Sequence, residues 1–147
     1  MTRIRKLAPV VDHVEKLEQD ALKAVAFSQQ RLQQQQQRLD QLIAYREEYA
    51  DRHSNGPVTY GAMQLREFQR FMAQLDQTIE QQREVVRLAE REVEFKRQKW
   101  KITRTRSDAM HKMIERISEQ ERKQLQQREQ KAMDEHALRQ SGKNGEV

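Results

Sequence analysis

Apolar side chains recur at alternating spacings of four and three residues along the second half of the chain. This spacing places them on one stripe of an α-helix, and a stripe held over seven repeats from Phe68 to Ile117 predicts a left-handed coiled coil. In the same register the next residues are polar, beginning with Glu121, so the stripe ends at Ile117 although helix-forming residues continue. The stripe consists of Phe68, Met72, Leu75, Ile79, Gln82, Val86, Ala89, Val93, Lys96, Trp100, Thr103, Ser107, Met110, Ile114 and Ile117.

A second stripe runs along the first half of the chain. It consists of Leu7, Val10, Val14, Leu17, Ala21, Val25, Ser28, Leu32, Gln35, Leu39, Leu42, Arg46 and Tyr49. The spacing from Leu17 to Ala21 and from Ala21 to Val25 is four residues twice in succession. Such a phase slip locally unwinds a supercoil, so we expect an irregularity there.

The concentrated turn signal of the chain is HSNGPVTYG, residues 53–61. Asn-Gly-Pro combines a residue tolerant of left-handed geometry, a permissive glycine and a proline without a backbone donor. We therefore expect a single domain with a helix over about residues 4–53, a loop over 54–59, a helix over 60–139 and a frayed tail over 140–147. Thr59 is the expected cap of the second helix, and Pro9 falls where a first helical turn tolerates it.

The two stripes can be tested against each other, because facing residues of an antiparallel hairpin have nearly constant summed numbers. Tyr49 with Met72, Leu42 with Ile79 and Ala21 with Trp100 all sum to 121, and the centre falls inside the expected loop. The small-large pair of Ala21 and Trp100 also suits a packed seam. The predicted fold is all-α, a long antiparallel two-helix coiled coil whose second helix overhangs at its C-terminal end by roughly 20 residues.

Composition supports a narrow seam rather than a globular core. The 147 residues are 35% charged and 35% hydrophobic, with 4 Gly and 2 Pro. The absence of cysteine excludes a disulfide scaffold and a thiolate metal site. No apolar run approaches the roughly 20 residues needed to span a bilayer, and the N-terminus does not resemble a secretory signal, so we expect a cytosolic protein.

Signals of catalysis are missing from the sequence. It contains neither a Gly-rich phosphate loop nor an HExxH motif, and a two-helix hairpin offers no third layer to enclose a substrate. His13, His53, His111 and His136 are scattered, and we expect each at the solvated surface. The sequence therefore predicts a non-enzymatic protein that acts by contact, with no cofactor, metal or small-molecule substrate.

A basic block, FKRQKWKITRTR, occupies residues 95–106 and carries six basic residues and no acid. The pairing sets it opposite residues 15–26, which include Glu15, Glu18 and Asp20. The block fits either charge pairing that orients the helices or a patch for an acidic protein or nucleic acid. Trp100 likewise fits a core position or a base-stacking platform. The candidate patch consists of Lys96, Arg97, Lys99, Lys101, Arg104 and Arg106.

Two segments, RLDQLIAYREEYADR before the loop and FQRFMAQLDQTIEQQR after it, resemble the flagellar FliJ family. The resemblance covers nearly the whole chain. It implies a cytoplasmic component of the bacterial flagellar type III export apparatus, at the cytoplasmic face of the basal body. Family members form a coiled coil similar to the stalk of rotary ATPases, insert into the hexameric ring of the export ATPase FliI, promote its assembly and contact the export gate protein FlhA. The resemblance also suggests the ATPase regulator FliH and export chaperones as partners.

The resemblance further implies a gate-contact patch beside the seam. Facing members of this patch have numbers that sum to 120, which places them on a second stripe. Tyr49 is shared by both stripes, whereas Tyr45 lies on the second alone and is the cleaner probe of function. The alternative is that Tyr45 and Phe71 only shield the seam. The patch consists of Arg38, Leu42, Tyr45, Tyr49, Phe71, Leu75, Thr78 and Gln82.

Three other functions fit the pattern. An export chaperone or escort would use the same helices without a ring partner, and the injectisome counterpart of the flagellar stalk would have a similar sequence. A nucleic-acid-binding coiled coil would use the basic block. The net charge of +5 is spread among interleaved signs, whereas dedicated nucleic-acid binders concentrate their positive charge.

Overall fold

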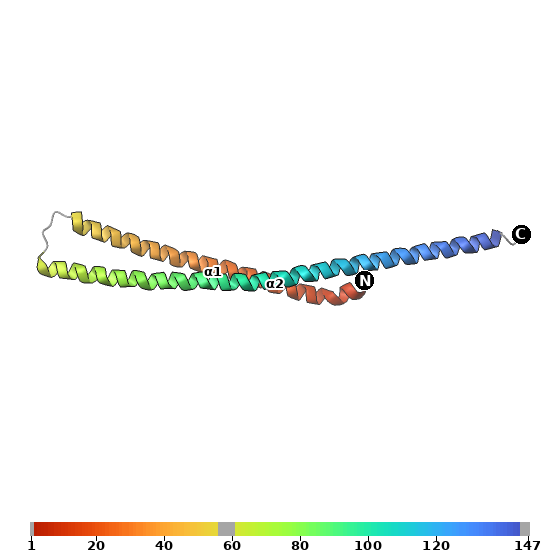
Figure 1. Ribbon diagram of the computed structural model, residues 1–147, viewed down its shortest axis with the longest axis horizontal. Coiled ribbons are helices and arrows are strands. Elements are labelled where there is room, and N and C mark those ends of the chain that lie inside the picture. Colours follow the sequence, from red (N-terminus) through yellow and green to blue (C-terminus); the bar gives the residue numbers. More distant parts are fainter. Residues whose placement is uncertain (1, 56–60, 145–147) are drawn as a thin grey trace. The chain divides into compact units, whose positions relative to one another are not determined.

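The structure, a computed structural model, describes residues 2–55 and 61–144, and these form two long α-helices (Figure 1). Helix α1 spans Thr2–Asn55 and has 54 residues, and helix α2 spans Ala62–Asn144 and has 83 residues. The two helices pack against each other as a hairpin, and no strand occurs in the described residues. The predicted all-α hairpin is therefore confirmed.

The hairpin contains two compact units, which are considered separately. The hairpin unit is Gln19–Lys101 and holds the end of α1 and the beginning of α2. The terminal unit is Met1–Glu18 with Ile102–Val147 and holds the beginning of α1 and the end of α2.

The hairpin unit contains the buried apolar side chains of the two helices, and Leu39, Leu75, Ile79 and Val86 pack together as one cluster. Each buried apolar side chain belongs to one of the two predicted stripes, so the seam of this unit is confirmed. Burying a side chain of this class contributes roughly 1.5–3 kcal/mol, which makes the seam the main source of stability. The buried apolar residues are Val25, Leu39, Leu75, Ile79, Val86, Ala89 and Val93.

Polar side chains on the seam of the hairpin unit find partners inside it. Gln82 Nε2 donates hydrogen bonds to the backbone carbonyl of Gln35 at 3.0 Å and to its Oε1 at 2.9 Å. The hydroxyl of Ser28 donates to the carbonyl of Val25 at 2.8 Å. A buried polar group costs little when it is hydrogen-bonded, which explains how a narrow seam tolerates these residues.

The expected phase slip in α1 is wrong. Val10 and Leu17 are each 43% exposed, whereas Val11 and Glu18 are half-buried. Non-exposed positions therefore continue along α1 from residue 4 to residue 53 at alternating spacings of three and four, with a few further half-buried residues beside them. A continuous coiled coil requires this alternation. The requirement places Glu18 on the seam although its neighbour Leu17 is more apolar. Glu18 can occupy a seam position because its methylene groups pack while its carboxylate stays in water.

Both helices extend further than expected. Ser141–Asn144 are helical, so the predicted frayed tail is wrong over these residues. Helix α1 begins before the expected first turn, so Pro9 lies inside it and removes the donor that would reach the carbonyl of Arg5. At the start of α2, the N–H of Gly61 donates to Gln64 Oε1 at 3.3 Å, as in a capping box. The predicted cap, Thr59, lies outside the described residues.

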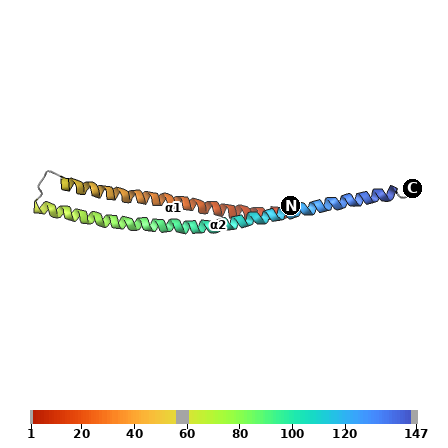
Figure 2. The same ribbon diagram turned by 45° about the horizontal axis from the view of Figure 1, so that its top comes forward.

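The terminal unit contains a stretch of helix without a partner. The last half-buried residue of α2 is Glu121, and every residue from 122 to 144 is exposed. In two views, α2 continues beyond the beginning of α1 (Figures 1 and 2). The seam therefore runs one turn past its predicted end at Ile117, to Glu121, whereas the predicted overhang of α2 agrees with this exposure. Among the described residues, no helix combines the length and apolar character needed to cross a membrane.

Candidate functional site

A cluster of aromatic rings lies in the hairpin unit, built from the last turns of α1 and the first turns of α2. The ring centroid of Tyr49 lies 4.6 Å from that of Phe71 and 5.6 Å from that of Phe68. Tyr45 lies 6.4 Å from both Tyr49 and Phe71. His53 stacks on Phe68 at 3.6 Å with an interplanar angle of 7°. The helical periodicity of α1 presents Tyr45, Tyr49 and His53 one turn apart, so the rings form a ladder.

Exposure distinguishes the members of this aromatic cluster. Tyr45 is 49% exposed, whereas Tyr49, Phe68, Phe71 and His53 are half-buried. Aromatic pairs at these distances contribute roughly 0.5–1.5 kcal/mol beyond the area they bury. The half-buried rings therefore pack α1 against α2 near the loop. Tyr45 contacts two of them, Tyr49 and Phe71, while about half of its surface faces water.

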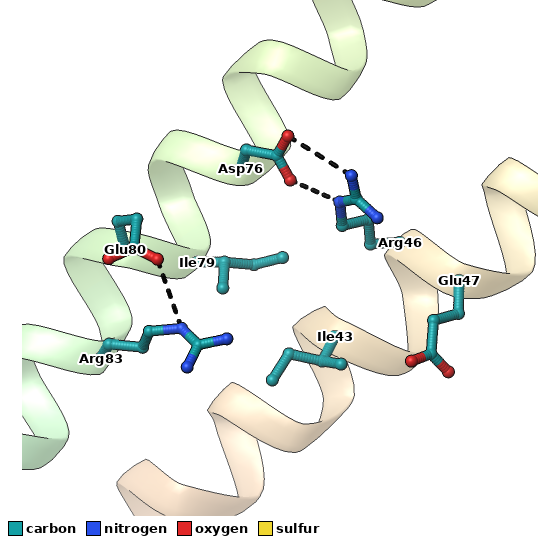
Figure 3. Close-up of a pocket in the computed structure, with 7 residues that line it drawn as sticks. All are labelled: Ile43, Arg46, Glu47, Asp76, Ile79, Glu80 and Arg83. Carbon is teal, nitrogen blue, oxygen red and sulfur yellow. Dashed lines mark hydrogen bonds and ion pairs between the residues drawn. The ribbon is translucent and has the colours of Figure 1, made fainter.

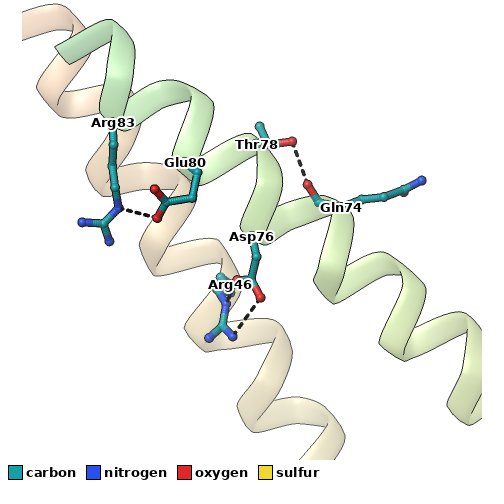
Figure 4. A network of polar contacts seen from close by, with 6 residues as sticks. All are labelled: Arg46, Gln74, Asp76, Thr78, Glu80 and Arg83. Atoms are coloured by element: carbon teal, nitrogen blue, oxygen red, sulfur yellow. Dashed lines mark hydrogen bonds and ion pairs between the residues drawn. The ribbon is translucent and has the colours of Figure 1, made fainter. Parts of the chain in front are cut away.

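The structure divides the predicted gate-contact patch into three sets. Arg38, Tyr45 and Thr78 are exposed, and the Thr78 hydroxyl donates to the Gln74 carbonyl at 3.0 Å (Figure 4). Half-buried positions are Leu42, Tyr49 and Phe71. Leu75 and Gln82 are each only 8% exposed, so they belong to the core and offer almost no surface to a partner.

Two members of the aromatic cluster were not predicted as site residues. Phe68 was assigned to the seam alone, and His53 was expected at the solvated surface, which is wrong because its ring packs on Phe68. The signal was present, since these two numbers sum to 121 like the other facing pairs. His111 also has a partner, because its Nε2 lies 3.3 Å from Glu15 Oε1. His13 and His136 are exposed as expected.

A shallow pocket of about 280 Å³ lies between the two helices of the hairpin unit (Figure 3). Arg46 of α1 forms a two-pronged ion pair with Asp76 of α2, and Arg83 Nε lies 3.4 Å from Glu80 Oε1 (Figures 3 and 4). The hydrogen bond and charge of Asp76 raise the pKa of Arg46 above its ordinary value. At this pocket the Arg46–Asp76 ion pair therefore links α1 to α2. Its lining residues are Ile43, Arg46, Glu47, Asp76, Ile79, Glu80 and Arg83.

The residues of the predicted basic patch are divided between the two units, with Lys96, Arg97, Lys99 and Lys101 in the hairpin unit and Arg104 and Arg106 in the terminal unit. Lys96 is half-buried on the seam, and Arg97, Lys99, Lys101, Arg104 and Arg106 are exposed. Lys99 Nζ lies 4.6 Å from the centre of the Phe95 ring. Trp100 is half-buried on the seam, which favours the core position over a base-stacking platform. Of the acidic residues expected opposite the block, Glu15 pairs instead with His111.

The family model for the flagellar FliJ protein matches residues 3–146, nearly the whole chain. The chain belongs to the flagellar FliJ family. Comparison with curated proteins and with solved structures gave no match. FliJ proteins are non-catalytic components of flagellar protein export, so the chain is a component of that apparatus. The FliJ assignment favours the flagellar function over the injectisome counterpart.

Proposed function

We propose that the chain is the stalk of the flagellar export ATPase and links the ATPase ring to the export gate at the cytoplasmic face of the basal body. The exposed end of α2, together with the beginning of α1, enters the hexameric FliI ring and promotes its assembly and activity. The aromatic cluster of the hairpin unit contacts FlhA. FliH and export chaperones are further partners in this proposal.

The exposed stretch of α2, residues 122–144, carries the ring proposal. Its backbone N–H groups are hydrogen-bonded within the helix, so it can enter a narrow protein channel without leaving them unpaired. Leu125, Met133 and Leu138 are 56%, 68% and 72% exposed, and a surrounding ring would bury them. Most helical stability in proteins comes from tertiary packing, which this stretch lacks, so a partner that surrounds it would also stabilise it.

The gate proposal is supported by the arrangement of Tyr45. Its ring is held in place by Tyr49 and Phe71, so little rotamer freedom is lost when a partner covers it. Tyrosine supplies a large apolar area with a polar end, and such residues are enriched among the energetically dominant contacts of protein interfaces. The surface offered to the gate is therefore Tyr45 flanked by Arg38 and Thr78.

Binding of both partners by one chain allows the two contacts to be coupled. If the conformation bound in the ring also favours the gate contact, each partner raises the affinity for the other, as thermodynamic linkage requires. Helix α2 contributes residues to both sites, so the two contacts belong to one continuous element.

The ring site is tested by a chain that ends at Glu121. We expect this truncation to abolish stimulation of FliI ATPase activity and to leave binding to FlhA unchanged. A full-length variant, Leu125→Gln with Met133→Gln and Leu138→Gln, keeps the helix and its length and should lose most of the stimulation. Full stimulation by the truncated chain would contradict the ring assignment.

The gate site is tested by Tyr45→Ala, which removes an exposed ring while keeping the core residues. We expect binding to FlhA to weaken at least tenfold, because truncation of a central aromatic contact commonly costs 2 kcal/mol or more. Leu22→Ala is the matched control, since it removes a 50% exposed apolar side chain elsewhere in the hairpin unit. Equal loss of gate binding in both variants, or loss of ring stimulation in Tyr45→Ala, would count against the division of sites.

A further inference from the structure

Two polar contacts cross between the helices of the hairpin unit at its apolar seam. Gln82 is 8% exposed, and its amide donates to both the backbone carbonyl and the side-chain oxygen of Gln35. Three turns further along α1, Arg46 forms the two-pronged ion pair with Asp76 of α2 (Figure 4). We call the Gln35–Gln82 and Arg46–Asp76 contacts the cross-helix polar pairs.

The apolar residues of the seam select the register of the two helices only weakly. A heptad pattern repeats every seven residues, so moving α1 along α2 by seven residues, about 10 Å, sets seam positions opposite seam positions again. Leu42, which the pairing sets opposite Ile79, would then face Val86 in one direction or Met72 in the other. Both alternatives are apolar. Burial of apolar surface is non-directional, so it distinguishes poorly among these three registers.

The glutamine pair does distinguish among them. In the first shifted register, Gln82 would lie beside Leu42 in place of Gln35. In the second, which is shifted the opposite way, Gln35 would lie beside Leu75. Each shift therefore sets at least one of the two amides against a leucine, and a buried amide without a hydrogen-bond partner is unfavourable.

The ion pair opposes both shifts as well. In the first shifted register Arg46 would lie beside Arg83, and like charges across the helices repel. In the second it would lie beside Gln69, and Asp76 would lose its partner. The Arg46–Asp76 contact therefore favours the observed register over either neighbour.

A third contact between the helices discriminates less. Arg31 lies 4.0 Å from Glu92, and both side chains are largely exposed. In the first shifted register Glu92 would lie beside Arg38, so one ion pair would replace another. Selection of the register therefore depends on the cross-helix polar pairs.

We propose that the cross-helix polar pairs fix the register of the hairpin unit and prevent α1 from sliding along α2. Gln35, Gln82 and Arg46 occupy seam positions that apolar residues fill elsewhere in this unit. Replacing both partners of a buried hydrogen bond by apolar residues is often neutral or stabilising. The polar pairs therefore contribute selectivity among registers, as a polar residue at a coiled-coil seam does, more than they contribute stability.

A fixed register has a consequence for the proposed function, and this consequence alone rests on that function. Helices that slide would carry a signal along the hairpin unit as a change of register. A hairpin unit with a fixed register moves as one body instead. Its two helices would then keep the same pairing whether or not FliI is bound.

Pairs of introduced cysteines measure the register, because the chain contains no cysteine of its own. Ser28→Cys with Val93→Cys reports the observed register, and Ser28→Cys with Val86→Cys or Trp100→Cys reports the two shifted registers. The fraction of intramolecular disulfide in a glutathione buffer gives the effective concentration of each pair, since the bond forms only between closely placed residues. We expect this concentration to be at least a hundredfold higher for the observed register than for either shifted one.

The triple variant Gln35→Leu, Gln82→Leu and Arg46→Leu makes the seam apolar at the cross-helix polar pairs. Each reporter pair is placed in this background and compared with itself in the unaltered seam. We expect at least a tenfold rise in the effective concentration of a shifted pair, with helicity and unfolding temperature by circular dichroism no lower than before. The double variant Gln35→Leu with Gln82→Leu retains Arg46 and should give a smaller rise.

The control variant Gln34→Leu, Gln81→Leu and Arg70→Leu makes the same changes at exposed positions of the two helices and should keep the observed register. An unchanged register in the triple variant would overturn the proposal, because the aromatic cluster or the connection between the helices would then decide the pairing. An equal shift in the control variant would overturn it too. So would a lower unfolding temperature of the triple variant without a shift, which would show that the polar pairs only stabilise.

The consequence for function is tested with the oxidised Ser28→Cys, Val93→Cys chain, in which the disulfide holds the observed register. It should stimulate FliI within twofold of the unaltered chain in the same non-reducing buffer. At least tenfold less stimulation, with Ser28→Ala, Val93→Ala fully active, would show that sliding is needed and would overturn the inference. If the unaltered chain gives no stimulation, the proposed function fails, whereas the cysteine measurements, which involve no FliI, still decide whether the register is fixed.

Discussion

In the hairpin unit seven apolar side chains are buried, whereas in the described part of the terminal unit the single buried side chain is Ser107. Both units use the same heptad spacing, and α2 runs through both. In the terminal unit the apolar seam residues Leu7, Val14, Met110 and Ile114 are only half-buried, and every residue from 122 to 144 is exposed. A heptad pattern therefore stabilises a helix only as far as a second helix supplies the matching surface.

This difference suggests a division of labour. The hairpin unit is stabilised by its own buried side chains, and it presents exposed side chains such as Tyr45 to partners. The end of α2 has helix-forming residues without a core, so its stability depends on what binds it.

Hydrogen exchange should give the largest contrast. Amides of α2 near Ile79 and Val86 exchange only when the hairpin unit opens, so we expect protection of about a thousandfold or more. Amides of residues 122–144 exchange by local fraying, and we expect less than about tenfold protection. Amide exchange followed by mass spectrometry measures both. Comparable protection of the two segments would contradict the assignment of residues 122–144 as an unsupported helix.

Truncation of a core side chain should give the next largest effect. Ile79 is 5% exposed, and Ile79→Ala should lower the free energy of unfolding by about 2–4 kcal/mol, because it removes buried methyl groups and leaves a cavity. Leu138→Ala in the exposed stretch should change the same free energy by less than about 0.5 kcal/mol. Urea unfolding followed by circular dichroism measures both variants, and similar losses would break the comparison.

Loss of the seam hydrogen bonds should be smaller. Gln82→Ala deprives Gln35 of the donor that serves both of its oxygens, and it should cost about 1–2 kcal/mol of unfolding free energy. Gln124 occupies the same heptad position in the exposed stretch, and Gln124→Ala should be nearly neutral. The pair isolates the hydrogen bonds from the loss of a glutamine. If Gln82→Ala were also neutral, the seam contact would be dispensable.

An ion pair at the surface of α2 should give the smallest effect, visible as a pH dependence. Arg87 Nε donates to Glu84 Oε2 at 2.8 Å, and this hydrogen bond holds the pKa of Glu84 below its ordinary value of 4.5. A carboxylate with a lowered folded pKa stabilises the fold above pH 4.5, and the contribution is lost as the pH falls through the folded pKa.

The unfolding temperature of Glu84→Gln should therefore lie slightly below that of the unaltered chain at pH 7, and the difference should vanish near pH 3. Glu129→Gln in the exposed stretch is the control and should show no comparable difference. A larger deficit for Glu84→Gln at pH 3 than at pH 7 would reverse the expected sign.

The pattern of residues was sufficient to predict the α2 seam and the antiparallel pairing, because heptad spacing and a central turn signal allow few other packings. It placed the end of the seam one turn too early, because Glu121 at the next seam position is polar but half-buried. The pattern also predicted that Tyr49 lies on the seam and Tyr45 beside it, since their heptad positions differ, and in the structure Tyr49 is half-buried and Tyr45 exposed. The stacking of His53 on Phe68 followed the same pairing but was overlooked. The role of the gate-contact residues stays a prediction.

Tertiary packing decided what the pattern left ambiguous. Hydrophobicity alone does not distinguish Val10 from Val11 as the seam residue, and it favours Leu17 over Glu18. In the structure the half-buried residues are Val11 and Glu18, because only these positions continue the interface with α2. The burial of Leu75 and Gln82 and the Arg31–Glu92 ion pair depend on both helices at once. By itself the sequence determined which face of each helix is apolar, because periodicity is local. How much of that face reaches water was decided by the facing helix, because exposure depends on residues far apart in the chain.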